Sequence, residues 1–125
     1  MEEKLRRLPD SELEVMQLLW SCDAPTPRAE LERRMQAQRP MAQSTLLTLV
    51  TRLSEKGFVK IEKQGRGSVY TPLISRADYQ ASSSRRFLDK VFCGSLPAFA
   101  SALTASGLTR EELDELRRLL EEDAL

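Results

Sequence analysis

Residues 41–72, MAQSTLLTLVTRLSEKGFVKIEKQGRGSVYTP, decide the fold. Their first half repeats apolar residues at i, i+3, i+4 and i+7, the pattern of one buried helical stripe: Leu46, Leu49, Val50 and Leu53. The opposite face is rich in hydroxyl groups and nearly free of acid, with Ser44, Thr48, Thr51 and Glu55, and with Thr45 and Arg52 at one flank. A solvated helix face usually carries Glu and Lys pairs. This face instead suits close approach to another surface, such as the major groove of DNA.

A hairpin is predicted directly after this helix. Gly57 stands where a helix ends in the left-handed conformation that glycine adopts without penalty. Residues 58–63 and 68–71 have the composition of strands, residues 64–67 are turn residues, and Pro72 ends the second strand. The expected fold class is therefore mainly α with a small β-hairpin, the layout of a winged helix-turn-helix. In this layout the helix over residues 42–56, called the reading helix below, reads DNA, and the hairpin, called the wing, lies along the DNA backbone.

Two helices are expected before the reading helix. Ser11 and Glu14 predict a capping box for the first, which ends near Cys22 with an inner stripe of Leu13, Met16 and Trp20. Thr26 is the expected N-cap of the second, with Pro27 at its first position and Gln38 near its end.

Capping and charge leave two alternatives open around the turn. The arginines of the second helix, Arg28, Arg33 and Arg34, either face DNA or form a solvated face paired with Glu30 and Glu32. Ala42 is a poor N-cap for the reading helix, so Ser44 or Thr45 is the alternative cap.

Three further helices are predicted after the hairpin. Ser75 with Asp78 and Thr109 with Glu112 are capping boxes, and Gly94 and Gly107 are stop signals. The expected organisation is a DNA-binding domain over residues 1–74 and a helical dimerisation domain over 75–125. So short a segment makes a marginal core alone, so we expect it to pair with a second copy rather than pack back on the winged domain. The expected interface is apolar: Phe87, Leu88, Val91, Phe92, Leu96, Phe99, Leu103, Leu113, Leu116 and Leu120.

Charge and composition narrow the function classes. The chain has 125 residues and a net charge of zero, yet residues 26–76 hold ten Lys and Arg against four acids. A local basic patch is the electrostatic footprint of a nucleic-acid binder. There is no His, and Cys22 and Cys93 lack metal-site spacing, so neither an enzyme nor a metal or other cofactor is expected. No signal peptide or membrane span is visible, and a reducing cytoplasmic location is expected.

The whole chain resembles the penicillinase and methicillin-resistance repressors, the BlaI/MecI/CopY group of bacterial transcriptional regulators. The resemblance rests on residues 13–20 (LEVMQLLW), 44–57 (STLLTLVTRLSEKG) and 65–72 (GRGSVYTP), and on Phe87-Leu88 and residues 92–96 (FCGSL) of the later arm. No single motif decides it, but their order and spacing are specific.

The resemblance implies a homodimeric repressor that binds inverted repeats in promoters through its reading helix and wing. It also implies a membrane sensor-transducer whose protease domain triggers cleavage of the dimerisation arm between Asn and Phe. The matching pair here is Ala102-Leu103, a departure from that pattern. A link to β-lactam resistance rests on the family alone. The chain lacks the Cys-rich tail of copper-responsive relatives.

Double-stranded DNA is therefore the expected partner. Ser44, Thr45 and Thr48 are expected at base edges or nearby phosphates, while Thr51 and Arg52 are expected to hold the DNA backbone. Arg66 is expected to reach phosphate or the minor groove from the wing, and Thr26 and Arg28 are expected to place the start of the second helix at a phosphate. The candidate DNA-binding residues are Thr26, Arg28, Ser44, Thr45, Thr48, Thr51, Arg52, Lys63, Gly65 and Arg66. The alternative function is a winged-helix protein-interaction module without DNA binding.

Overall fold

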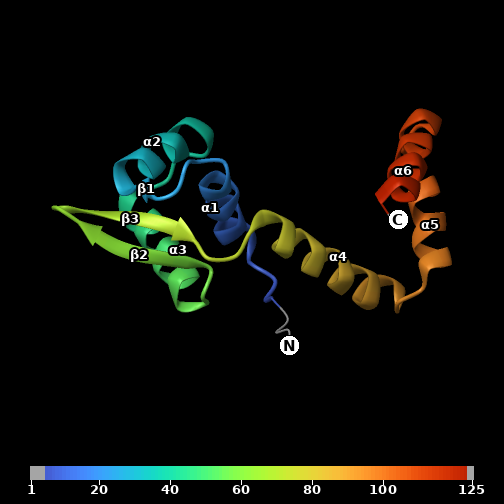
Figure 1. Cartoon of the computed structure of the whole chain (residues 1–125), viewed down its shortest axis with the longest axis horizontal. Helices are drawn as coiled ribbons and strands as arrows, with labels where there is room; N and C mark the ends of the chain where they lie inside the picture. Colours follow the sequence, from blue (N-terminus) through green and yellow to red (C-terminus); the bar gives the residue numbers. More distant parts are fainter. Residues whose placement is uncertain (1–4, 124–125) are drawn as a thin grey trace. The chain divides into compact units, whose positions relative to one another are not determined.

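A computed structural model describes residues 5–123 of the chain (Figure 1). Helices and strands follow in the order α1 (Asp10–Trp20), β1 (Thr26–Pro27), α2 (Arg28–Gln38), α3 (Gln43–Glu55), β2 (Val59–Gln64), β3 (Gly67–Pro72), α4 (Arg76–Phe92), α5 (Leu96–Ala105) and α6 (Arg110–Asp123). The expected fold class, mainly α with a small hairpin, is confirmed. The chain forms two compact units, divided between Ser83 and Ser84 within α4.

The core of the first unit gathers around the apolar stripe of α3. All four stripe residues that the sequence predicts are buried: Leu46, Leu49, Val50 and Leu53. They share one cluster with Val15, Met16 and Leu19 of α1 and with Leu31 and Met35 of α2. The predicted stripe of α1 is only partly right, because Leu13 and Trp20 pack at the margin of this cluster while Val15, Leu18 and Leu19 are buried.

The helix ends follow the sequence signals in some places and not in others. Gly57 has a φ of 85°, which confirms it as the left-handed residue after α3. Thr109 and Glu112 form the reciprocal capping box at the start of α6. The box expected at Ser11 is wrong, because Pro9 is the N-cap of α1 and no side chain caps it. Glu14, the other half of that box, pairs with Arg39 instead.

A three-stranded antiparallel sheet, in the order β1-β3-β2, completes the first unit, and its Val59 and Tyr70 belong to the core cluster. Gln64 pairs with Gly67, so Gly65 and Arg66 form the two-residue turn of the hairpin, and Gly65 has a φ of 62°. Strand β1 was not predicted. Thr26 pairs with Tyr70 there instead of capping α2, whose N-cap is Pro27.

Tyr79 ties the start of α4 to the first unit. Its hydroxyl accepts a hydrogen bond of 2.8 Å from the buried backbone N–H of Leu8. Its ring lies 5.8 Å from that of Phe58 and 5.9 Å from that of Trp20. The first compact unit therefore includes the first turns of α4, and the domain division between residues 74 and 75 stays a prediction.

The second unit consists of the rest of α4 with α5 and α6. Gly94, with a φ of 79°, follows α4, and the Ser95 hydroxyl caps α5 by accepting from the N–H of Ala98. The rings of Phe87, Phe92 and Phe99 contact one another edge to face, with centroids 5.3–6.4 Å apart. Among the described residues, no helix is long and apolar enough to cross a membrane.

Deleting the Tyr79 hydroxyl tests the tie at the start of α4. We expect Tyr79→Phe to lower the free energy of unfolding by about 1–3 kcal/mol, because the buried N–H of Leu8 loses its acceptor. Urea denaturation of the whole chain measures the change.

Tyr70→Phe is the matched control. Tyr70 is also buried, but its hydroxyl makes no hydrogen bond to the described residues. Equal losses in the two variants would contradict the structural importance of the bond between Leu8 and Tyr79.

Candidate nucleic-acid interface

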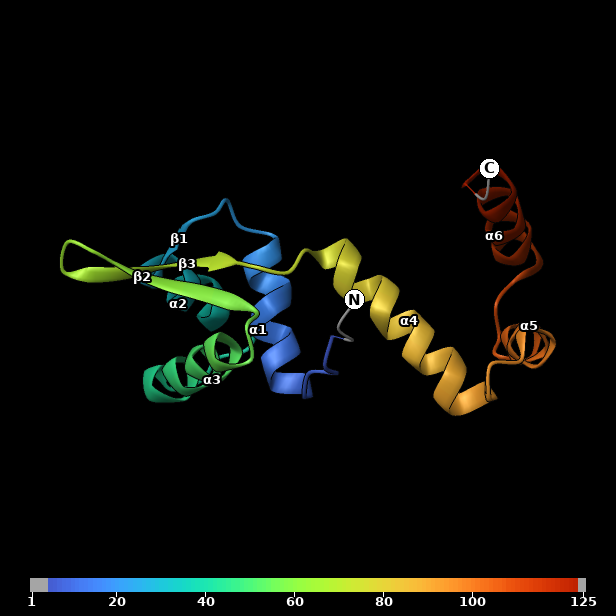
Figure 2. The ribbon, with the colours of Figure 1, turned by 60° about the horizontal axis from the view of Figure 1, so that its bottom comes forward.

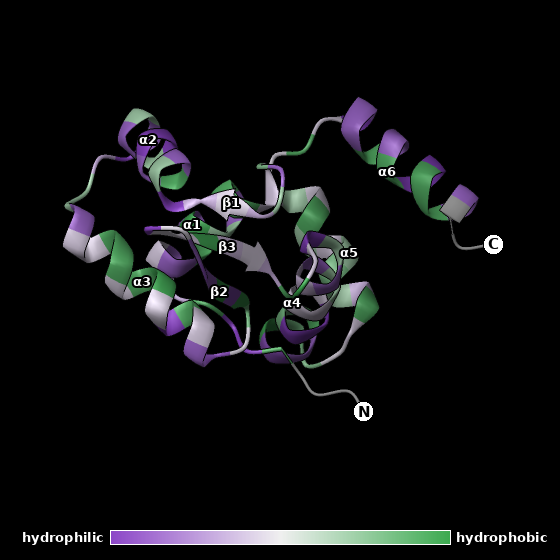
Figure 3. Cartoon of the chain, turned by 60° about the vertical axis from the view of Figure 1, so that its left-hand side comes forward, coloured by the Kyte–Doolittle hydropathy of each residue, from purple (hydrophilic) through white to green (hydrophobic). Residues whose placement is uncertain are grey.

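The outer face of α3 presents small hydroxyl groups to solvent. Ser44, Thr45, Thr48 and Thr51 are all exposed, as are Gln43, Arg52 and Glu55. Ala42 is the N-cap and no side chain caps the helix, so neither Ser44 nor Thr45 serves as the alternative cap. Apolar and polar residues alternate along α3 in the hydropathy colouring (Figure 3). The face that the sequence predicted to meet DNA is thus accessible.

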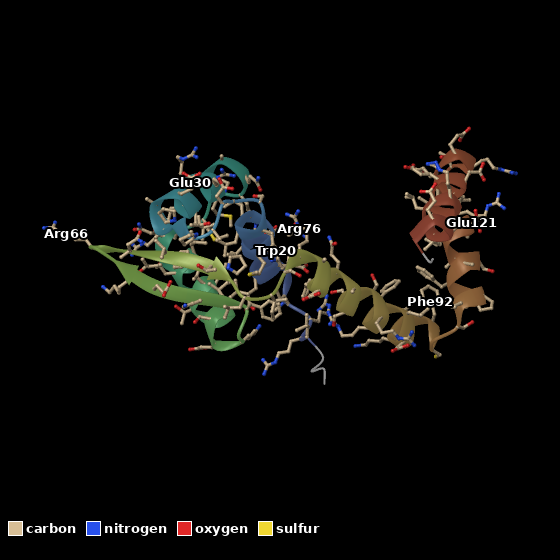
Figure 4. The ribbon with its side chains drawn as sticks, viewed as in Figure 1. Trp20, Glu30, Arg66, Arg76, Phe92 and Glu121 are labelled. Carbon is tan, nitrogen blue, oxygen red and sulfur yellow. The ribbon has the colours of Figure 1, made fainter. Side chains whose placement is uncertain are left out.

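The wing, which is the hairpin of β2 and β3, adds exposed basic groups to the candidate surface. The hairpin of β2 and β3 extends well past the helices of its unit (Figure 2). Arg66 lies at its far tip and points away from the sheet (Figure 4). Lys63 and Gly65 beside it are also exposed. The hairpin therefore carries its cations where a neighbouring backbone could reach them.

Most other basic residues of this region are already paired with acids. Arg33 and Arg34 both bond Glu30 at 2.7 Å, and Lys60 lies 3.3 Å from Glu62. Arg39 pairs with Glu14, and Lys56 with the buried Glu12. The guanidinium of Arg76 lies over the ring of Trp20. Within residues 5–123, the side chains of Arg52, Lys63 and Arg66 have no such partner. These three cations are the available part of the basic patch.

The expected role of Thr26 needs correction, and Arg28 has an acid as its partner. Thr26 is only 1% exposed and its hydroxyl donates to the carbonyl of Asp23, so its side chain cannot contact DNA. The Nε of Arg28 bonds Glu32 at 2.9 Å. For the arginines of α2 the paired alternative is therefore the one that the structure shows.

These ion pairs hold the acids of α2 in their charged form. Hydrogen bonds from Arg34 and then Arg33 lower the pKa of Glu30. For Glu32, the bond from Arg28 is the largest cause of a lowered pKa, with a smaller contribution from Gln43. The two acids of α2 therefore offset two of its three arginine charges, which leaves one positive charge on this surface.

The described geometry matches proteins that are already known. Residues 8–122 fit the sequence profile of the penicillinase repressor family. The chain belongs to this family. It is 32% identical over 120 residues to the penicillinase repressor of Bacillus licheniformis, covering 95% of this chain and 93% of that protein. It is 29% identical over 121 residues to the methicillin resistance regulatory protein MecI of Mammaliicoccus sciuri, and this match covers 96% of this chain and 98% of that protein.

Two solved structures resemble part of this family member. The solution structure of the DNA-binding domain of the repressor BlaI is 32% identical with a TM-score of 0.54, and the match covers 63% of this chain and 94% of that one. The solution structure of the monomeric form of Bacillus licheniformis BlaI, in complex with the blaP half-operator, is 33% identical with a TM-score of 0.52. This match covers 61% of this chain and 92% of that one.

One residue of the candidate surface was missed by the sequence analysis. Gln43 is the first residue of α3 and is exposed, and its Nε2 donates to Glu32 at 2.9 Å. The signal was available, because an amide at the start of a reading helix can recognise adenine.

No metal-binding group emerges in this family member. Among the described residues, no three or more His, Cys, Asp and Glu side chains gather in a way that could hold a metal ion. Cys22 is partly buried and Cys93 is exposed, and both are free thiols.

Removing Arg28 tests its pairing with Glu32. In Arg28→Ala we expect the pKa of the Glu32 carboxyl to rise toward its ordinary value, because the guanidinium bond that lowers it is gone. An NMR titration of the Glu32 side-chain carboxyl carbon measures this pKa. Arg33→Ala is the control, since Arg33 bonds Glu30 and should leave the pKa of Glu32 unchanged. An unchanged pKa of Glu32 in Arg28→Ala would contradict the ion pair between these two residues.

Proposed function

We propose that this chain is a DNA-binding transcriptional repressor that acts as a homodimer. Helix α3 enters the major groove and the hairpin follows the adjacent backbone. The observation that carries the proposal is the outer face of α3, which presents small exposed hydroxyls with Arg52 beside them. Lys63 and Arg66 lie on the wing, and these three cations have no acidic partner among residues 5–123. The relative solved in complex with a half-operator supports the same use of this fold.

Each exposed group has a role that fits its chemistry. Ser44, Thr45 and Thr48 contact base edges or nearby phosphates. The hydroxyl of Thr48 donates to the carbonyl of Ser44 and keeps its lone pairs as acceptors. Thr51 and Arg52 contact the backbone.

The wing adds phosphate contacts. Lys63 and Arg66 provide the charge, and Gly65, with its positive φ, forms the tight turn that brings Arg66 to the tip. Because affinity for DNA depends on phosphates neutralised by cations, three free cations matter more than the net charge of the chain.

The helical arm supports the homodimer. Its large apolar side chains remain exposed in one copy, among them Phe87 at 50%, Val91 at 55%, Leu96 at 64% and Leu120 at 60%. Leu119, outside the set that we expected, is 44% exposed. A second copy would cover such an apolar surface. Two copies would also present two reading helices to the two halves of an inverted repeat.

Repression follows from occupancy of a promoter, because a bound dimer blocks polymerase. Loss of the dimer would release the DNA, since one half-site holds one copy weakly. Ala102 and Leu103 lie inside α5 and are partly buried. They replace the Asn-Phe pair of relatives that are cleaved, so the proposal includes no cleavage at this bond.

Selection of bound duplexes from a random DNA pool tests the function. We expect enrichment of an inverted repeat with half-sites about one helical turn apart, and a dimer in sedimentation. Binding without an enriched motif would overturn sequence-specific repression. No retained DNA at low salt would favour the protein-interaction alternative.

Removing Arg66 tests the wing on the selected duplex. We expect Arg66→Ala to lower the affinity for every DNA sequence by a similar factor. It should also reduce the slope of log affinity against log salt concentration by about one unit, because one phosphate contact is lost. Fluorescence anisotropy at several salt concentrations measures the slope.

Arg33→Ala is the control for this variant. Arg33 is also exposed, but it is paired with Glu30, which keeps Arg34 as a partner. An unchanged slope in Arg66→Ala would remove the wing from the interface.

A further inference from the structure

The polar link between the two helices of the helix-turn-helix starts at Gln43. The Nε2 of Gln43, the first residue of α3, donates a hydrogen bond of 2.9 Å to Oε2 of Glu32 on α2. The same Oε2 accepts a bond of 2.9 Å from Nε of Arg28. Glu32 thus joins the first turn of α2 to the first residue of α3.

This link fixes which atoms of the Gln43 amide face outward. The bond from Arg28 keeps Glu32 ionised, and an ionised carboxylate only accepts hydrogen bonds. The amide nitrogen of Gln43 must therefore face Glu32. Its carbonyl oxygen and its second N–H remain for another partner, and the residue is exposed. The Gln43 amide thus offers its carbonyl oxygen as an acceptor and its second N–H as a donor, and the bond to Glu32 fixes which of the two positions each group occupies.

That pair of groups matches one base. In the major groove adenine presents the N6 amino group as a donor and N7 as an acceptor, and a glutamine amide pairs with both. Residues at the start of a reading helix are the ones that reach base edges. Gln43 stands at that start.

We propose that Gln43 reads an adenine in each half-site and that Glu32 positions its amide for this contact. The inference rests on the proposed DNA-binding function and names a specificity residue of the same surface. The other exposed polar groups of the first two turns of α3 are hydroxyls, which donate or accept and so discriminate weakly between bases. Gln43 is also the only amide in α3. The sharpest base preference of the protein is consequently assigned to it.

Selection from a random pool, repeated with Gln43→Ala, tests the proposal. The wild-type motif should contain one strongly preferred adenine in each half-site, and Gln43→Ala should lose that preference while the rest of the motif is kept. Affinities for the selected duplex and for one with that A·T pair replaced should differ about 5- to 150-fold in the wild type and little in the variant. Gln17→Ala is the control, because Gln17 is an exposed glutamine of α1.

A double-mutant cycle tests the role of Glu32. Glu32→Gln places an amide that can turn either group toward Gln43, so the outward order is no longer set. We expect it to reduce discrimination at the same base pair by less than Gln43→Ala does. Combined with Gln43→Ala, it should cause no further loss of discrimination. The ratio between duplexes is the readout, because removal of an acid raises affinity for all DNA alike.

The possible failures are distinct. If the wild type selects a motif and Gln43→Ala selects the same one, the assignment of Gln43 is overturned while the repressor function stands. Additive effects of the two variants at different base pairs would remove Glu32 as the positioning residue. If the wild type selects no motif, the proposed function itself fails.

Discussion

Burial of one stripe of α3 is the constraint on which the rest of the first unit depends. A helix that places Leu46, Leu49, Val50 and Leu53 in the core has one orientation about its own axis. The hydroxyl-bearing residues Ser44, Thr48 and Thr51 then lie on the outward face, because the buried stripe sets the rotation of the helix. Hydrophobic packing thus orients the polar face that is proposed to meet DNA.

Charge is arranged so that few cations remain available. The sequence shows a basic stretch, but the structure places an acid against six of its ten arginines and lysines. The exposed pairs among them add little stability. Their effect is to offset most of the positive charge of α2. Among the described residues of this stretch, they leave Arg52, Lys63 and Arg66 without an acidic or aromatic partner. A net charge of zero is therefore compatible with a local site for a polyanion.

Local patterns in the sequence were sufficient for much of the fold. The stripe of α3, the stop at Gly57 and the hairpin turn each depend on residues close together in the chain. Features that join distant residues were missed, because spacing within a segment carries no information about them. Strand β1 exists only because Thr26 meets Tyr70, and Glu14 pairs with Arg39 rather than capping its own helix. The outward hydroxyls of the candidate site were predictable, whereas the bond between Gln43 and Glu32 requires the turn between two helices.

The order of the strands has a consequence for the behaviour of the protein at high concentration. Strand β3 lies in the centre, β1 has only two residues, and β2 forms the long edge. An unprotected edge is a template on which a strand of another molecule can add. Lys60, Glu62 and Lys63 are exposed along β2 and place charge there. An approaching strand would have to desolvate those charges, so the hairpin resists edge-to-edge aggregation. Its tip stays open to a ligand.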